Sequence, residues 1–313
     1  STQAKTLFPY TTLFRSSIAG LADFGAVFLD STLSWTGGGT SSTLGTGLFV
    51  GGGTTTLTNV SLCGTFRGNR KGPAVNGAFT GKATITSHGL TTCDSEGLGL
   101  LHVDVSATHS DLVATGNAAA GVWVQSSSSF ELAGTSNVID KNQFAGLVFV
   151  DVLKVKLSNA KISNTGKAKL PFGENHASVS LGDGIQLVRS ATDVWFDSVG
   201  VSENAHTGFQ IDLGPNEITS PLFKMLWTGV TAESSGDAYG AVCQGSPNGV
   251  GEVWGPGVVG WDTGIVRSGA AAINDGLLVD PNERVGLVDP NEIPSPTSIL
   301  KGGGLAGIGV SGL

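Results

Sequence analysis

Apolar and polar residues alternate in short segments along most of the chain. The segments begin with glycine followed by an apolar residue, any residue and a second apolar residue, as in Gly121-Val-Trp-Val and Gly146-Leu-Val-Phe. Alternation with a period of two is the pattern of a β-strand with one buried face. It predicts that the following side chains are buried: Val122, Val124, Leu147, Phe149, Ile185, Leu187, Phe209 and Ile211.

The segments form an internal repeat. They open at Gly25, Gly47, Gly72, Gly97, Gly121, Gly146, Gly184, Gly208, Gly240 and Gly264. Most of these glycines are about 24 residues apart, and the longer gaps indicate insertions at 164–183 and 213–227. A strand that recurs once per repeat is typical of a solenoid, in which neighbouring repeats bury each other's faces. We therefore predict an all-β fold over 17–275, with 1–16 and 276–313 outside the regular repeat.

A second column of residues lies four positions before the repeated glycine. It contains Asn117, Asn142 and Asn204, with Cys93 in the same place and Asn69 one residue out of step. Asparagine tolerates left-handed turns and satisfies backbone groups there. We expect a structural ladder of stacked amides, in which Asn117 and Asn142 are buried neighbours, and no catalytic role for these residues.

The repeats resemble the coils of a known fold. Segments 121–145 and 183–207 are similar to coils of the right-handed parallel β-helix, the pectin-lyase-like fold, and in particular to β-helix repeat proteins exported by environmental bacteria. The resemblance covers 25–267 and implies a single-stranded right-handed parallel β-helix of about ten rungs, a rung being one turn of the solenoid. It does not select a function, because lyases, hydrolases, epimerases and adhesins share this coil.

The first residues have a different character. Residues 6–16, TLFPYTTLFRS, resemble a translated sequencing adapter, as in a chain from a metagenomic assembly. We therefore expect 1–16 to be artefactual or disordered, and the natural N-terminus with any signal peptide to be missing. Under this interpretation, the expected location is extracellular or at the cell surface.

Composition and charge exclude several classes of protein. Glycine contributes 48 of 313 residues and charged residues only 13%, which excludes a charged coiled coil and an ordinary helical enzyme. The net charge is −8 and the lysines and arginines form no dense patch, so we expect no nucleic-acid partner. We also expect no membrane span in this sequence, and either a monomer or part of a longer chain.

One group of charged residues is a candidate for chemistry. Enzymes with this fold act on polysaccharides through clustered carboxylates, but the Asp-Asp and Gly-His-Gly motifs of polygalacturonase-like members are missing. Asp151 and Arg189 each follow a repeated glycine by five residues, and Asp183 and Asp212 lie near that column. Such a group could bind calcium or act as acid and base. The alternative is a surface ion pair with turn aspartates. Apart from calcium at this group, we expect no cofactor and no metal.

The cysteines and the C-terminal segment add little chemistry. Cys63 and Cys93 fall on consecutive repeats but 16 and 21 residues after their glycines, so we expect that they do not stack directly; a disulfide between them stays open. Cys243 lies in an inward column and is expected to be a small core residue. The sequence VDPNE occurs at 279–283 and again at 288–292. We interpret both copies as surface turns, with calcium ligation as the alternative.

Three functions remain. The first is a non-catalytic secreted or cell-surface protein with a structural, adhesive or carbohydrate-contact role, favoured by low charge, Ser/Thr-rich faces and missing catalytic motifs. The second is a polysaccharide lyase, hydrolase or epimerase with a divergent site. The third is a passenger or spacer rod of a larger exported protein. We take the first as the prediction, and polysaccharide is the partner that it implies.

Overall fold

The computed structural model describes part of the chain. The described residues are 12–20, 23–68, 74–166, 182–188, 193–205, 208–212, 223–228, 231–233, 241–244, 251–254, 258–259, 266–268, 273–274, 298–301 and 308–311. Side chains are described at 17–20, 23–68, 74–166, 182–188, 194–205 and 208. These residues form β-strands and turns, with no helix among them.

The strands form two parallel sheets. The 11-stranded sheet contains β2 (Phe24–Leu29), β4 (Thr46–Gly51), β7 (Val75–Thr80), β10 (Leu98–Val103), β13 (Ala120–Gln125), β16 (Ala145–Val150), β18 (Asp183–Val188), β20 (Phe209–Asp212), β23 (Ala241–Gln244), β26 (Val266–Ser268) and β29 (Ile308–Ser311). The 18-stranded sheet contains β1 (Thr12–Ala19), β3 (Thr32–Leu44), β5 (Thr54–Thr58), β6 (Ser61–Phe66), β8 (Thr84–His88), β9 (Thr91–Cys93), β11 (Ser106–Ser110), β12 (Val113–Thr115), β14 (Ser129–Ala133), β15 (Asn137–Asp140), β17 (Lys154–Ser163), β19 (Asp193–Ser202), β21 (Phe223–Thr228), β22 (Thr231–Glu233), β24 (Gly251–Trp254), β25 (Val258–Val259), β27 (Ile273–Asn274) and β28 (Ser298–Lys301).

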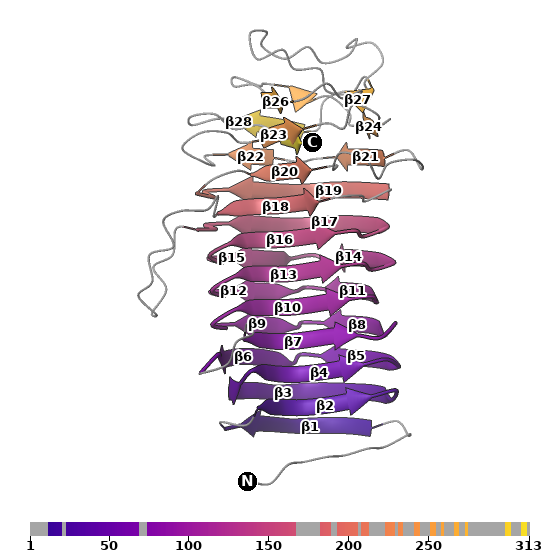
Figure 1. Cartoon of the computed structure of the whole chain (residues 1–313), viewed down its shortest axis with the longest axis vertical. Helices are drawn as coiled ribbons and strands as arrows, with labels where there is room; N and C mark the ends of the chain where they lie inside the picture. Colours follow the sequence, from indigo (N-terminus) through magenta and orange to yellow (C-terminus); the bar gives the residue numbers. More distant parts are fainter. Residues whose placement is uncertain are drawn as a thin grey trace.

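A rung consists of one strand of the smaller sheet followed by two strands of the larger sheet. β13, β14 and β15 make up one rung, and each pairs in parallel with its counterpart in the next, β16 and the two halves of β17. Figure 1 shows the strands of successive rungs stacked along the long axis of the molecule. This solenoid-like arrangement of parallel sheets is compatible with the predicted β-helix.

The lumen of the solenoid is apolar. Its largest fully buried side chains include Trp35, Phe79, Phe130, Phe149 and Phe196, and these belong to one hydrophobic cluster that runs through the described rungs. The prediction of burial is confirmed for Val122, Val124, Leu147, Phe149, Ile185 and Leu187. The side chains of Phe209 and Ile211 lie outside the described ones.

The register corrects two of the predicted repeats. Leu48 pairs with Gly77, and Leu100 pairs with both Gly77 and Val122. The positions equivalent to Gly121 are therefore Asn76 and Gly99, whereas the sequence pattern placed them at Gly72 and Gly97. As a result Val75 and Leu98, which the repeat placed on the inward face, are buried but belong to a second apolar cluster outside the lumen.

Close approach between rungs explains the repeated glycine. A Cβ at Gly25, Gly99 or Gly121 would lie 2.4–2.8 Å from the carbonyl oxygen of the next rung, closer than any real Cβ contact. At Gly99 and Gly121 the same Cβ would also lie 2.8 Å from the side-chain nitrogen of Asn117 or Asn142. The glycine therefore leaves room both for the next backbone and for an asparagine amide.

The corner between the two strands of the larger sheet needs a left-handed residue in each rung. Asn59, Gly89, Asp111, Gly134 and Asn159 occupy it in successive rungs, all with φ between 49° and 86°. Glycine and Asn/Asp adopt this conformation most readily. A Cβ at Gly89 would lie 2.4 Å from Asn59 Oδ1, and one at Gly134 would lie 2.7 Å from Asp111 Oδ1. The polar side chain of one rung thus covers the glycine of the next.

Strands also pair near both ends of the chain, and the boundaries expected at residues 16 and 276 stay predictions. β1 begins at Thr12, inside the segment that resembles an adapter, and pairs with β3. In the 276–313 segment, β28 pairs with β22, and β29 pairs with β20 and β23. Both VDPNE copies lie outside the described residues.

Candidate functional site

The predicted carboxylates divide between the two ends of the smaller sheet, with Asp151 and Asp212 at one end and Asp183 at the other. Asp151 follows β16 at a corner, with φ of 53°, whereas Asp183 opens β18 and is fully buried beside Gln186, which donates a hydrogen bond to it. Asp183 pairs with Ala145, at the opposite end of β16 from Asp151. Asp212 ends β20, where its backbone pairs with Val188, and Arg189 lies outside the described residues. The structure therefore does not bring Asp151 and Asp183 together.

The predicted asparagine ladder is confirmed at Asn117 and Asn142. Both are fully buried, and Asn142 Oδ1 accepts hydrogen bonds from the backbone N–H of Asn117 at 3.2 Å and from its side-chain amide at 2.9 Å. Asn204 Oδ1 accepts the backbone N–H of Thr165 in the same way, at 3.2 Å. An amide oxygen thus caps a backbone N–H of the preceding rung, which would otherwise be buried without a partner.

Asn76 also belongs to the ladder, and the sequence repeat does not reveal it. Ser95, where the register correction places the ladder position of its rung, donates its backbone N–H to Asn117 Oδ1 at 3.2 Å. The amide next to it comes from Asn76, in the glycine column: Asn76 Oδ1 accepts the Thr65 N–H, and Asn76 Nδ2 donates to Asn117 Oδ1, both at 3.2 Å. Cys93, predicted in the ladder, lies two residues before Ser95.

Two histidines are buried in the lumen. His102 and His109 are fully buried, with their Nε2 atoms 3.1 Å apart, and His109 Nδ1 lies 2.7 Å from Ser87 Oγ. Burial lowers the pKa of His109 to about 3, and burial together with His109 lowers the pKa of His102 well below its ordinary value. Both rings are therefore neutral at neutral pH, and they serve as packing groups between Phe79 and Phe130.

The hydrogen-bond partners of the two histidines determine which of their ring nitrogens carry a proton. Among the described residues His102 Nδ1 has no hydrogen-bond partner. A neutral imidazole carries one N–H and one lone pair, and burying an unpaired N–H is costly. This assigns the His102 proton to Nε2, which donates to His109 Nε2, so that His109 Nδ1–H donates to Ser87. Ser87, His102 and His109 are all buried, so this group offers no open position for a substrate.

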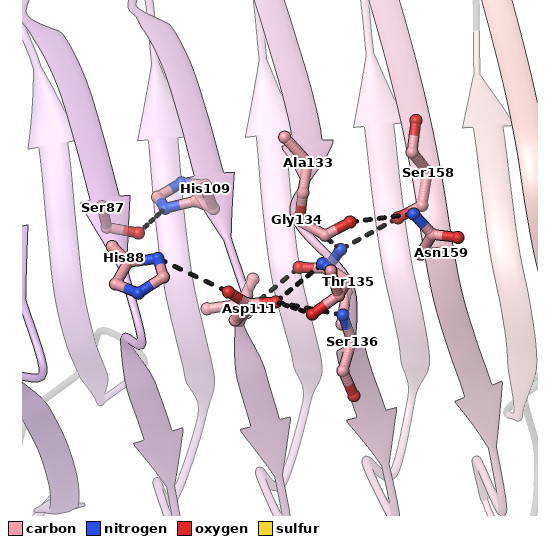
Figure 2. A network of polar contacts seen from close by, with 12 residues as sticks. Ser87, His88, His109, Asp111, Ala133, Gly134, Thr135, Ser136, Ser158 and Asn159 are labelled. Carbon is pink, nitrogen blue, oxygen red and sulfur yellow. Dashed lines mark hydrogen bonds and ion pairs between the residues drawn. The ribbon is translucent and has the colours of Figure 1, made fainter.

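A second polar network lies at the outer corner (Figure 2). Asp111 Oδ1 accepts the backbone N–H groups of Thr135 at 2.8 Å and Ser136 at 3.0 Å, and Asp111 Oδ2 lies 3.4 Å from His88 Nδ1. The two backbone donors hold the pKa of Asp111 below its ordinary value. Asn159 donates to the Gly134 carbonyl one rung further along, at 2.8 Å. These contacts join successive rungs, and both oxygens of the Asp111 carboxylate take part in them.

A disulfide joins Cys63 and Cys93. The two residues are register partners on β6 and β9, with their Cα atoms 4.5 Å apart. The spacing from the repeated glycines suggested that they do not stack directly, which is wrong because the second of those glycines was misplaced. Disulfides persist in oxidising compartments, so this one agrees with an exported protein.

Outward side chains of the larger sheet form a two-dimensional array of hydroxyl groups. We call it the hydroxyl face; it comprises Thr32, Ser34, Thr36, Thr54, Thr56, Thr58, Thr84, Thr86, His88, Ser106, Thr108 and Ser110. The register aligns these residues in three columns across β3, β5, β8 and β11, so that Ser34, Thr56, Thr86 and Thr108 are successive neighbours. All are exposed or half-exposed, and every one except His88 carries a hydroxyl group.

The hydroxyl face ends at β11, and charged side chains follow on the next strands. In the middle column, the residues after Thr108 are Glu131, Lys156 and Trp195. Lys156 Nζ lies 2.8 Å from Glu131 Oε1 and 5.2 Å from the centre of the Trp195 ring. The sequence shows the Thr-x-Thr spacing of each strand, but the columns depend on register between residues that are distant in sequence.

No family model, curated protein or solved structure matches the chain. Within the described residues, no three His, Cys, Asp or Glu side chains gather as a metal site would require. The same part of the chain contains no helix with the length and apolar character needed to cross a membrane. The hydroxyl face is therefore the candidate functional site.

Proposed function

We propose that the chain is an exported, non-catalytic, right-handed parallel β-helix of about ten rungs whose role is adhesive. Its hydroxyl face adsorbs to a solid that itself repeats hydroxyl groups, such as a crystalline polysaccharide or ice. The alignment of Thr and Ser in three columns over β3, β5, β8 and β11 is the observation that carries this proposal. The Cys63–Cys93 disulfide supports export.

Several features favour adsorption over catalysis. Acid–base catalysis needs positioned groups within reach of one substrate atom, but Asp151 and Asp183 occupy opposite ends of their strands. The buried histidines are neutral and enclosed. The hydroxyl face instead offers a broad, regular surface, which suits contact with an extended solid through many weak hydrogen bonds.

A sedimentation assay tests the adhesive role. The chain would be mixed with particles of crystalline cellulose, chitin or ice, and the bound fraction measured. We expect adsorption to at least one of these solids and a several-fold loss of it for Thr56→Lys/Thr86→Lys, in the middle column. The matched control is Thr91→Lys/Thr115→Lys, which adds the same charge on outward positions of β9 and β12. No adsorption by the wild-type chain, or equal losses for both variants, would contradict the proposal.

A further inference from the structure

We propose that the solid recognised by the hydroxyl face is ice. This inference rests on the proposed adhesive function and names the surface that the face fits. It starts from geometry: hydrogen-bonded strands are about 4.8 Å apart, and alternate residues of one strand are about 6.7 Å apart. The three columns therefore repeat hydroxyl groups along two perpendicular directions. These two repeats are close to those of water oxygens along the a and c axes of hexagonal ice.

The side chains have the chemistry to hold water at these points. A threonine hydroxyl both donates and accepts hydrogen bonds, and the neighbouring methyl group fills the space between bound waters. Within the described residues, no side-chain hydrogen bond engages Thr54, Thr56, Thr84 or Thr86, whereas Thr55 and Ile85, which lie between them on the strands, are buried in the lumen. Their hydroxyl groups are therefore available to an external lattice of water.

The absence of charge on the face separates ice from a polysaccharide. From Thr32 to Ser110, the three columns contain no carboxylate, ammonium or guanidinium group. A charged group orders water around itself and so disrupts an ice-like arrangement. Sugar rings are bound mainly by aromatic rings and by planar amide or charged groups, and His88, at one edge beside Asp111, is the only such side chain of the face. A neutral array of hydroxyl and methyl groups matches water better than sugar.

The face is also rigid. Threonine has a restricted χ1 angle, and the backbone spacing of β5, β8 and β11 is fixed by continuous parallel pairing. The Cys63–Cys93 disulfide ties β6 to β9, the strands that directly follow β5 and β8 across one corner. A pre-organised surface loses little conformational entropy on binding, which matters when each contact is weak.

Thermal hysteresis, the gap between the melting and freezing temperatures of a single ice crystal, tests the proposal. We expect the whole chain to open such a gap and to facet the crystal. Thr56→Lys/Thr86→Lys should lose most of the gap, whereas Thr91→Lys/Thr115→Lys should keep it. Circular dichroism checks that both variants are folded. If the lysine pair fails to fold, Thr86→Tyr, which adds bulk without charge, replaces it.

The outcomes separate this inference from the adhesive function. A wild-type chain that adsorbs to cellulose or chitin but opens no gap overturns ice binding and leaves the adhesive function intact. A chain that adsorbs to no solid, ice included, overturns both. A gap that persists in folded Thr56→Lys/Thr86→Lys shows that ice binds elsewhere, and so overturns the assignment to this face.

Discussion

The amide of Asn76 occupies the place in the ladder that Ser95 leaves open. In the two following rungs the residue at the ladder position supplies its own amide: Asn117 accepts the N–H of Ser95, and Asn142 accepts the N–H of Asn117. In the rung of Ser95, the amide comes from the glycine column instead, and Asn76 Oδ1 accepts the N–H of Thr65. Asn76 in place of a glycine and Ser95 in place of an asparagine therefore compensate each other.

This compensation predicts strong coupling between the two positions. Asn76→Gly should cost about 1–3 kcal/mol of unfolding free energy, because the buried Thr65 N–H loses its acceptor. Ser95→Asn alone should also destabilise, since the Asn76 amide already fills the space. The double variant should recover most of the loss, because Asn at 95 restores the usual ladder. Urea denaturation of the four proteins measures the coupling, and simple additivity of the two losses would contradict the prediction.

Because the two histidines are buried, we predict that acid destabilises the folded chain. Their pKa values are lowered in the folded state, so the unfolded chain binds more protons, and the stability that they contribute is complete above about pH 6.5 and falls as the pH drops toward 3. For His109 the loss between pH 6.5 and pH 4 is on the order of 3 kcal/mol.

Replacing both histidines isolates this effect. His102→Val/His109→Leu places apolar residues like their column neighbours Val124 and Leu132 at the two positions. Denaturation at pH 7 and pH 4 should show a smaller pH dependence for this variant than for the wild type. His88→Ala is the control, because His88 is exposed on the outer face. Equal pH dependence in all three proteins would show that the buried pair does not titrate on unfolding.

The disulfide should contribute about 2–4 kcal/mol, as expected for a closed loop of this size; the two cysteines are 30 residues apart. The chain contains three cysteines. Thiol titration of the unfolded chain should therefore detect one thiol before reduction and three after it. Thermal unfolding of Cys63→Ser/Cys93→Ser, compared with wild type with and without reductant, measures the stability. A reductant effect that persists in the variant would point to another cause.

We predict that removing a large side chain from the lumen lowers the unfolding free energy strongly, because it leaves a cavity. Phe149 is buried against Phe130, with ring centroids 5.3 Å apart, so Phe149→Ala should cost about 3–5 kcal/mol. Phe49→Ala is the control, because Phe49 belongs to the same sheet but lies outside the lumen, only partly buried. Equal losses in the unfolding free energy of the two variants would contradict the assignment of the two faces.

Sequence pattern predicts the parts of the fold that depend on local alternation. It identifies Val124 and Phe149 as inward and places Asn117 and Asn142 in one ladder, because these rungs have nearly constant length. It misplaces Val75 and Leu98, because Gly72 and Gly97 also precede apolar residues and the true glycine position of one rung is occupied by Asn76. The hydroxyl face needs register as well: Thr56 and Thr86 become neighbours only after the rungs between Gly47 and Gly99 are aligned.

The corner residues limit how this rod can be lengthened. Asn59, Gly89, Asp111, Gly134 and Asn159 alternate between a polar side chain and glycine, and the polar side chain of one rung covers the glycine of the next. Copying one rung in place would set two polar residues or two glycines next to each other at this corner. Copying two consecutive rungs keeps the alternation. Between Asn59 and Asn159, the natural cassette for gene duplication, or for an engineer who wants a longer rod, is therefore a pair of rungs; the alternation ends at Ser198, which follows Asn159 at this corner.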